Sequence, residues 1–478
     1  MSEKSWPDDD SFSALNPSGT LAASPAEDDF QFEIDPAFLT GLEGRRLKSA
    51  LMLGMVWGGT IALHQFTWGY WLTTALAALM GGHCLRAYAT RPRAVVVPMD
   101  PKAVRPQVTL MVAAKNEEAV VDRLVDQLCN LDYPRDRYEV WFIDDASTDQ
   151  TPAILDRLAL QHQNLRVVHR PAGSPGGKSG ALNQVFPRTV GEFIVVFDAD
   201  AQIAPDFLDR SLPAFDHPSV GAVQLRKAII QAETPNHPQG KNFWIQGQQA
   251  EMALDAFMRQ QQIAVGGIGE LRGNGQLVRR QAIEDCGGWN EGTITDDLDL
   301  SLRLHLNNWD IECLTAPAVY EEGVTQAIAL WHQRSRWAEG GYQRYLDYWR
   351  MLVQNRLGLT KSFDLVVFVV MQYIMPMVAV PDLLMAVMKH QAPVFTPITI
   401  ITFGLFFLSA VRGLRRSFVL MPLKEQRDVS WFWLVKQSVL GAVYMAHWLP
   451  VIAFTTARMA VRKKRLKWVK TAHSGQHA

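Results

Sequence analysis

Apolar residues gather in two blocks near the ends of the chain, and a more polar region lies between them. The first block contains one stretch from Ser49 to about His64 and another from Phe66 to about Cys84. Each is close to the roughly 20 residues that a helix needs to cross hydrocarbon. Basic residues flank the pair on both outer sides, so residues 45–90 are predicted to form a transmembrane hairpin with both ends in the cytosol. A buried hairpin in a soluble protein is the alternative, which Trp68 and Trp71 near the proposed interface disfavour.

The second apolar block, residues 363–458, is predicted to form transmembrane or interfacial helices. Its three segments run from about Asp364 to Met388, from Val394 to Val411 and from Trp431 to Ala457. The loop 412–416 and the tail 459–478 are both basic, which predicts that both lie in the cytosol. Three full spans would place them on opposite sides. The last segment is therefore either an interfacial or re-entrant helix or a short hairpin broken near Pro450.

Between the two blocks, residues 105–350 alternate short apolar runs with amphipathic ones. Val108–Ala113, Val140–Ile143 and Phe193–Phe197 are predicted to be buried strands, and Glu118–Asn130 and Thr151–Leu160 to be helices. Strands that alternate with helices predict an α/β domain whose mainly parallel sheet is covered on both faces. In such sheets, ligands bind beyond the carboxyl ends of the strands.

The chain ends and the bulk composition narrow the possible functions. Residues 1–44 are acidic and rich in Ser, Pro and Ala, so they are predicted to be disordered. The formal net charge of -1 gives no sign of a nucleic-acid-binding protein, and no nucleic-acid partner is expected. The 4 cysteines lie far apart and form no CxxC pair, which predicts reduced thiols that face the cytosol.

Carboxylates directly follow two of the predicted strands. Asp144 and Asp145 follow the second strand, where a carboxylate can accept the imide N–H of uracil or bind ribose hydroxyls. Capping of the next helix by the polar residues of this segment is the alternative. Asp198 and Asp200 follow the third strand, and such a pair can share Mg²⁺, which prefers carboxylate and phosphate oxygens. Two unpaired carboxylates at the end of a buried strand are costly, which favours a metal site over a merely polar strand end.

Two further segments have both a structural and a functional interpretation. Lys178 lies in the glycine-rich turn 176–183, which opens a helix and can bring a cation and backbone N–H groups to a diphosphate. Asp296 and Asp297 follow Thr295 at the start of an amphipathic helix, where the helix dipole favours anions. Asp297 can equally serve as a general base that takes a proton from an acceptor hydroxyl.

Gln333, Arg336 and Trp337 precede the second apolar block. Arg336 can pair with diphosphate oxygens, and Trp337 can pack against a sugar. A juxtamembrane belt of arginine and tryptophan is the alternative, and the segment in isolation favours it.

Taken together, the order and spacing of these motifs resemble the family 2 glycosyltransferases, in the membrane-bound branch that includes cellulose, hyaluronan and poly-N-acetylglucosamine synthases. The resemblance covers about residues 105–350 and implies a GT-A (Rossmann-like) domain, an inverting mechanism, a UDP-sugar donor and Mg²⁺ or Mn²⁺. The middle residue of the family's TED box is Asp296 here, which leaves the expected base in place. The resemblance implies catalysis by Asp297, metal binding by Asp198 and Asp200, and substrate binding by Asn116, Glu117, Asp144, Asp145, Lys178, Asp198, Gln333, Arg336 and Trp337.

Within that branch, the chain most resembles cyanobacterial glucosyltransferases that act on diacylglycerol, including the segments Ser5–Asp10 and Gly41–Lys48. This implies transfer of glucose from UDP-glucose to the sn-3 hydroxyl of 1,2-diacylglycerol in glycolipid synthesis. It also implies a multi-pass protein of the plasma or thylakoid membrane with a cytosolic catalytic domain. A processive polysaccharide synthase is the alternative, which the short apolar flanks disfavour. A catalytically silent sugar-nucleotide sensor is disfavoured because every expected carboxylate is present.

Overall fold

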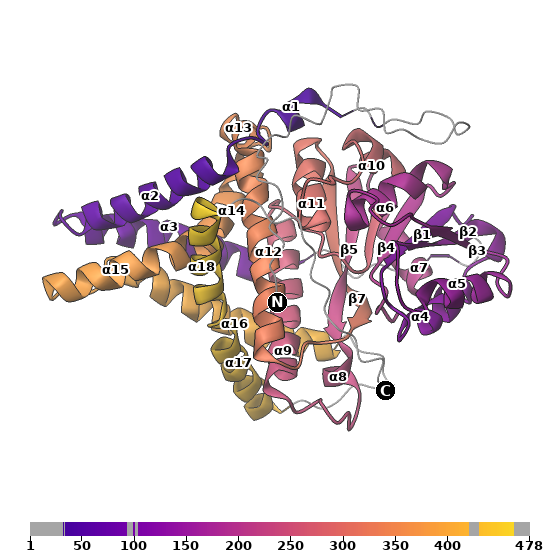
Figure 1. Ribbon diagram of the computed structural model, residues 1–478. Coiled ribbons are helices and arrows are strands. Elements are labelled where there is room, and N and C mark those ends of the chain that lie inside the picture. The colour runs from indigo at the N-terminus through magenta and orange to yellow at the C-terminus, as the bar shows by residue number, and fades with distance from the viewer. Residues whose placement is uncertain (1–31, 33, 93–98, 101–103, 420–429, 463–478) are drawn as a thin grey trace, which may run out of the picture.

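A seven-stranded sheet forms the centre of the middle region of the chain, and a group of long apolar helices lies beside it (Figure 1). The computed structural model describes residues 32, 34–92, 99–100, 104–419 and 430–462, and the statements below refer to these residues. Most of the predicted N-terminal tail, and the predicted basic tail beyond residue 462, lie outside the described residues.

The sheet is mixed, with strand order β3-β2-β1-β4-β6-β5-β7. β1 pairs in parallel with β2 and β4, and β2 pairs in parallel with β3, as the alternating pattern predicts. β6 runs antiparallel to both β4 and β5, and β5 pairs in parallel with β7. The strands are β1 (Val108–Ala114), β2 (Tyr138–Asp144), β3 (Leu165–His169), β4 (Phe193–Phe197), β5 (Val220–Ile229), β6 (Gln276–Arg279) and β7 (Asp310–Glu321).

Helices cover both faces of this sheet because successive strand residues point to opposite sides. On one face, Leu110 and Val112 pack with residues of α4 (Val121–Cys129), α5 (Thr151–Ala159) and α7 (Phe207–Ser211). On the other face, their neighbour Met111 packs with residues of α6 (Gly177–Val185), α10 (Arg280–Asp285) and α11 (Asp296–Leu306). The carboxyl ends of β1, β2 and β4 meet at one edge, since Ala114 pairs with Asp144 and Val112 pairs with Phe197.

Two long helices lie between the sheet and the apolar helices. α9 (Phe243–Ala264) packs against β5 and β7 on one side and against α16 and α17 on the other. α12 (Ala327–Asp347) contacts α11 of the catalytic domain and also α2 and α18. These two helices therefore connect the sheet to the apolar part of the molecule. The short helices of this region are α8 (Ile230–Glu233) and α13 (Trp349–Val353).

The apolar helices comprise an N-terminal pair and a C-terminal group. α2 (Arg45–Leu63) and α3 (Gly69–Ala89) form the hairpin that the sequence predicts; that it crosses a membrane stays a prediction. Among the described residues, Leu359–Lys389, Thr396–Ser417 and Trp431–Val461 are long and apolar enough to cross a membrane. The C-terminal helices are α14 (Leu359–Val369), a π-helical turn (Val370–Ile374), α15 (Met375–Lys389), α16 (Thr396–Val419), α17 (Trp431–Met445) and α18 (Trp448–Val461).

The last apolar segment contains a turn, but not at Pro450, which lies inside α18; whether the segment is interfacial, re-entrant or a hairpin stays a prediction. α17 ends at Met445 and α18 begins at Trp448, with a turn at Ala446 and His447 between them. Each half is shorter than the roughly 20 residues of a membrane span. α17 packs against α9, whereas α18 packs against α2 and α12. In Figure 1, α2, α3 and α15 project together away from the sheet, while α12, α17 and α18 run across their bases.

The predicted disorder of residues 1–44 is wrong for the part of that segment from residue 34 onward. Residues Pro36–Leu39 form α1, which begins with the Asp35 carboxylate accepting the backbone N–H of Ala37 at 2.9 Å. Phe38 is buried, and its ring meets that of Tyr348 edge-on with 5.7 Å between centroids. Asp35 also pairs with Arg356 at 3.1 Å, so both an apolar contact and an ion pair hold this short segment against the rest of the molecule.

An ion pair joins the N-terminal hairpin to the catalytic domain. Nε and Nη2 of Arg45, at the start of α2, donate to the two carboxylate oxygens of Asp347, at the end of α12, each at 2.6 Å. The Asp347 side chain is fully buried and that of Arg45 is 13% exposed. Such a bidentate pair fixes direction as well as distance, so it sets where α2 leaves the domain.

Removal of this pair should loosen the attachment of the hairpin. We expect Arg45→Met to lower the free energy of unfolding by about 3 kcal/mol, because the Asp347 charge stays buried without its partner. The measurement is the thermal unfolding midpoint of the detergent-solubilised protein. Arg46→Met, at the exposed neighbouring position, is the control and should leave the midpoint unchanged. Equal midpoints for the two variants would contradict the structural role of the pair.

Candidate active site

One cavity of about 1020 Å³ opens at the carboxyl edge of the sheet and continues between the apolar helices. It brings together most of the residues that the motifs predict, although they come from distant parts of the sequence. The predicted residues that line it are Glu117, Asp145, Lys178, Asp198, Asp200, Asp297, Gln333, Arg336 and Trp337.

Two predicted residues do not line this cavity. Asp144 is buried and holds its own turn together, because its carboxylate accepts the backbone N–H of Ser147 at 3.0 Å and contacts Nδ1 of His169 at 3.0 Å. Asn116 has a left-handed backbone with φ of 56°, and its side-chain oxygen accepts the backbone N–H of Thr148 at 2.7 Å. Both residues therefore shape the loops beside the site.

Asp145 is the carboxylate of the Asp-Asp pair that faces the cavity. It is held by Arg170, which also donates to the carbonyl oxygens of Pro175 and Gly177 in the glycine-rich turn. Lys115 lies 3.4 Å away on the other side. Arg170 thus couples the strand end of β2 to the start of α6, and Asp145 stays oriented for a hydrogen-bonding ligand.

Lys178 and Asp198 meet at the centre of the polar end. The Lys178 ammonium lies 2.6 Å from the Asp198 carboxylate and 3.9 Å from that of Asp296. Burial acts to lower the pKa of Lys178, but the attraction of these carboxylates outweighs it and raises the pKa above its ordinary value. Asp200 accepts the backbone N–H of Glu322 at 3.2 Å. Asp198 and Asp296 thus create a negatively charged region at this end of the cavity, which already holds the Lys178 ammonium.

Asp297 lies in the first turn of α11, and its surroundings make it a stronger base than an ordinary aspartate. Burial raises the pKa of Asp297 to about 6, and the adjacent Asp296 charge acts in the same direction. The backbone N–H of Leu298, Lys178 and Arg272 oppose this effect. Thr295 is the residue before the helix, but its side chain makes no capping hydrogen bond. The purely structural interpretation of a capped helix therefore loses its main support.

Two glycines let the chain approach this carboxylate closely. A Cβ at Gly273, where φ is 83°, would lie 3.4 Å from a carboxylate oxygen of Asp297 and 3.9 Å from one of Asp198. A Cβ at Gly340 of α12 would lie only 2.3 Å from the Thr295 hydroxyl. The absence of side chains keeps the space between the two carboxylates open and lets α12 pack directly on the start of α11.

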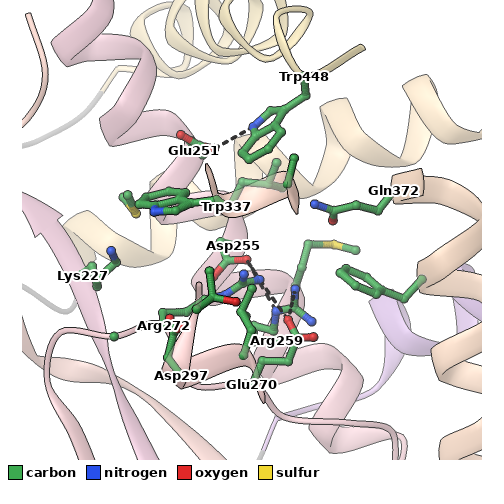
Figure 2. A pocket seen from close by; sticks show the side chains of 18 of the residues that line it. Lys227, Glu251, Asp255, Arg259, Glu270, Arg272, Asp297, Trp337, Gln372 and Trp448 are labelled. Carbon is green, nitrogen blue, oxygen red and sulfur yellow. Dashed lines mark hydrogen bonds and ion pairs between the residues drawn. The ribbon is translucent and has the colours of Figure 1, made fainter. Parts of the chain in front are cut away.

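Trp337 on α12 forms one wall of the cavity (Figure 2), and two cationic side chains lie against its ring. The Arg334 guanidinium lies 4.0 Å from the ring centroid and the Lys227 ammonium 5.0 Å from it. Arg334 is fully buried and pairs with Glu251 of α9. Glu251 also accepts the indole N–H of Trp448 at 2.8 Å. Trp337 is therefore packed against charged residues of the catalytic domain. A tryptophan that only formed part of a juxtamembrane belt would not need these contacts.

The opposite wall holds a charge network that the motifs do not indicate. Glu270 forms ion pairs with Arg259, at 2.8 Å, and with Arg344 and Arg272. Burial raises the pKa of Glu270, but the three arginines outweigh it and hold the pKa at about 2. Arg272 pairs with Asp255 at 2.7 Å and is close enough to lower the pKa of Asp297. The glycine-rich run 266–275 is the only local signal of this loop.

Comparisons with known proteins show the family to which this chain belongs. A family described as "Glycosyltransferase like family 2" matches residues 106–340. Two proteins named beta-monoglucosyldiacylglycerol synthase, from Trichormus variabilis and Nostoc sp., are each 52% identical over 477 residues, which cover 99% of this chain and 99% of each relative. The chain belongs with these synthases in glycosyltransferase family 2. A third, from Synechocystis sp., is 50% identical over 482 residues, 99% of this chain and 97% of the relative.

Among solved structures, a mannosyltransferase from Pyrobaculum calidifontis in complex with GDP-Man and Mn²⁺ shares 21% identity, with a TM-score of 0.48 over 81% of this chain and 98% of that one. The family match and the mixed α/β sheet confirm the predicted glycosyltransferase domain of GT-A type. The family match therefore favours an enzyme over the catalytically silent sensor.

Proposed function

We propose that this protein transfers glucose from UDP-glucose to the sn-3 hydroxyl of 1,2-diacylglycerol, with inversion, to give beta-monoglucosyldiacylglycerol. The names of the relatives support this product. One observation carries the proposal for this chain. A single cavity is lined by Lys178, Asp198 and Asp297 and also by apolar residues of α15, α16 and α18. A sugar nucleotide can therefore bind at the polar end of this cavity while a membrane lipid binds at its apolar end.

The arrangement of the helices supports a multi-pass membrane protein with the catalytic domain in the cytosol. The end of α2 lies beside the end of α15, since Lys389 donates to the carbonyl oxygen of His64 at 2.6 Å. The sides of α2, α3 and α15 expose large apolar residues, such as Met55 at 65%, Trp71 at 71% and Leu383 at 60%. The basic segment 412–416, which the sequence predicts as a loop, is instead the last part of α16. It lies at the other end, where Arg412 donates to the carbonyl oxygen of Tyr88 at 3.2 Å. The positive-inside rule assigns this end to the cytosol.

In this proposal, the donor lies at the polar end of the cavity. Asp145 accepts a hydrogen bond from the uracil or ribose, and Glu117 lies beside it. Lys178 and Arg336 bring positive charge to the diphosphate, and Trp337 packs against the transferred sugar. Gln333 lines the same wall of the cavity.

The donor set at Asp198 and Asp200 fits a divalent cation. Both carboxylates line the cavity, and Asp198 already attracts the Lys178 ammonium. Hard cations such as Mg²⁺ and Mn²⁺ prefer these oxygens together with those of phosphates. A cation bound there would neutralise charge on the departing diphosphate. The two aspartates are thus its proposed ligands.

Asp297 is the proposed general base. It takes the proton of the acceptor hydroxyl as the hydroxyl oxygen attacks the anomeric carbon of glucose and the bond to UDP breaks. Attack from the face opposite UDP converts an α-linked donor into a β-linked product. Burial next to the lipid end supports this role, because the pKa of about 6 makes the carboxylate a better proton acceptor than a solvated one.

The product assay tests the proposal directly. Purified protein with radiolabelled UDP-glucose and diacylglycerol should give one chloroform-soluble glycolipid, and UDP-galactose and UDP-N-acetylglucosamine should give far less. Asp297→Asn should lower the rate by roughly 10²- to 10⁴-fold, the usual contribution of a general base, while UDP binding persists. Label found only in an ethanol-insoluble polymer would instead indicate a polysaccharide synthase.

The pH dependence should report Asp297. The ionised carboxylate is the active form, so kcat/KM should fall as the pH decreases through about 6. Asp296→Asn removes a neighbouring negative charge that raises this pKa, so the acidic limb of its residual activity should move to lower pH. Asp122→Asn, at an exposed site on α4, is the control. An acidic limb that stays in place in Asp296→Asn would exclude Asp297 as the titrating group.

Metal removal tests the aspartate pair. We expect exhaustive treatment with EDTA to lower the rate by roughly 100-fold or more, given the several kcal/mol that a cation contributes to such transition states, and Mg²⁺ or Mn²⁺ to restore it. Asp198→Asn should need a much higher metal concentration for half-maximal activity. Full activity after chelation would overturn the metal assignment.

A further inference from the structure

The cavity has a second half, which the donor and the base do not use. Beyond Asp297 it continues between α15, α16 and the broken α17–α18 segment. This half is lined mainly by apolar side chains from three separate stretches of the C-terminal block. They include Met375 and Ala379 of α15, Phe403 and Phe406 of α16, and Leu449 and Ile452 of α18.

This apolar half reaches the outer surface of the helix group. Phe403 and Leu449 line the cavity, yet they are 56% and 42% exposed, and Ala379, which also lines it, is exposed too. The break at Ala446 and His447 lies beside this opening, since Met445, Ala446 and Trp448 also line the cavity. An uninterrupted helix would continue straight across this side. The opening therefore faces the surroundings of candidate membrane-spanning segments, where lipid is the available ligand.

A single amide projects into the cavity from the helix that forms its floor. Gln372 lies in the π-helical turn Val370–Ile374, and its side chain points into the pocket opposite Trp337 (Figure 2). The turn has a local cause. Pro376 has no N–H for the carbonyl of Gln372, four residues earlier, so the helix widens there. π-Helical turns of this kind are frequent at functional sites.

The Gln372 amide has no hydrogen-bond partner among the described residues, although charged groups near it are paired with one another. Glu251 is held by Arg334 and Trp448, and Asp255 and Glu270 are held by arginines. Gln372 is half-buried and lines the cavity, so its amide is available to a ligand that lies there. A ligand with a hydrogen-bonding group between its reactive hydroxyl and its apolar chains would satisfy it.

We propose that the opening between α15, α16 and α18 admits the diacylglycerol acceptor from the membrane, and that Gln372 binds an ester carbonyl of its glycerol backbone. The acyl chains occupy the apolar half of the cavity, and the free hydroxyl reaches Asp297. This inference rests on the proposed function, because the acceptor is the one assigned there. It adds the route of the lipid and a residue that none of the motifs contains.

Acceptor kinetics test the role of Gln372. Gln372→Met keeps the length of the side chain and removes the amide. Loss of one hydrogen bond should raise the KM for diacylglycerol by roughly three- to tenfold, while the KM for UDP-glucose stays within about twofold. Gln372→Asn, which keeps the amide on a shorter stem, should recover part of the effect. A KM for diacylglycerol equal to that of the unaltered protein would overturn the role of Gln372.

A matched pair of substitutions on α15 tests the opening. Ala379→Trp places a large side chain in the lining, whereas Val380→Trp places the same side chain on the exposed face beside it. Obstruction should lower transfer to dioleoylglycerol by about tenfold or more in Ala379→Trp, with a smaller loss for dioctanoylglycerol. Val380→Trp should behave like the unaltered protein. Equal activities of the two variants would place the lipid route elsewhere.

Photolabelling separates this inference from the function on which it rests. A diacylglycerol with a diazirine on one acyl chain should label the segments 375–389, 396–409 and 442–452, and excess dioleoylglycerol should suppress the label. If the unaltered protein makes no glucolipid, the proposed function fails, and labelling still reports lipid entry. If it makes glucolipid but the label lies outside these segments, only the route fails.

Discussion

The buried carboxylate of Glu270 is the interaction on which the walls of the cavity depend. It is 2% exposed and gathers Arg259 of α9, Arg344 of α12 and Arg272 of its own loop. An isolated charge at this depth would be strongly disfavoured, and the removal of one partner from such a group usually costs several kcal/mol. The two long helices are therefore held at fixed positions relative to the sheet.

α9 and α12 contact both the sheet domain and the apolar helices. Arg334 with Glu251 joins the two helices to each other, and Asp347 with Arg45 of α2 and Glu339 with Arg458 of α18 join α12 to the apolar group. Their other faces pack on apolar helices, for example where Gly247 of α9 approaches the ring of Tyr444 of α17. A catalytic domain that merely rested on a membrane would not need such paired charges between its helices and the apolar group.

The same placement explains the chemistry of Asp297. In the proposed mechanism the base meets a lipid hydroxyl at the apolar end of the cavity, and burial raises the pKa of Asp297 to about 6. Lys178 and Arg272 limit this rise, so the carboxylate is still ionised at neutral pH. In the proposed mechanism, Asp297 lies where the polar donor end of the cavity meets the apolar acceptor end. Burial raises its pKa, and the charged groups of the polar end adjust it.

The sequence by itself determined the features that depend on local order. Period-two and apolar runs identified β1, β2 and β4, and the rule that ligands bind beyond strand ends brought Asp145 and Asp198 to one edge. Only the tertiary structure decided which carboxylate of a pair is used, because neighbouring residues point to opposite sides and Asp144 turns away. It also decided the Glu270 network, whose partner Arg344 is 74 residues away, since no local pattern encodes such contacts. The position of the turn between α17 and α18 also comes only from the structure, where α17 packs against α9 and α18 packs against α2 and α12. Composition gives both halves the same apolar character.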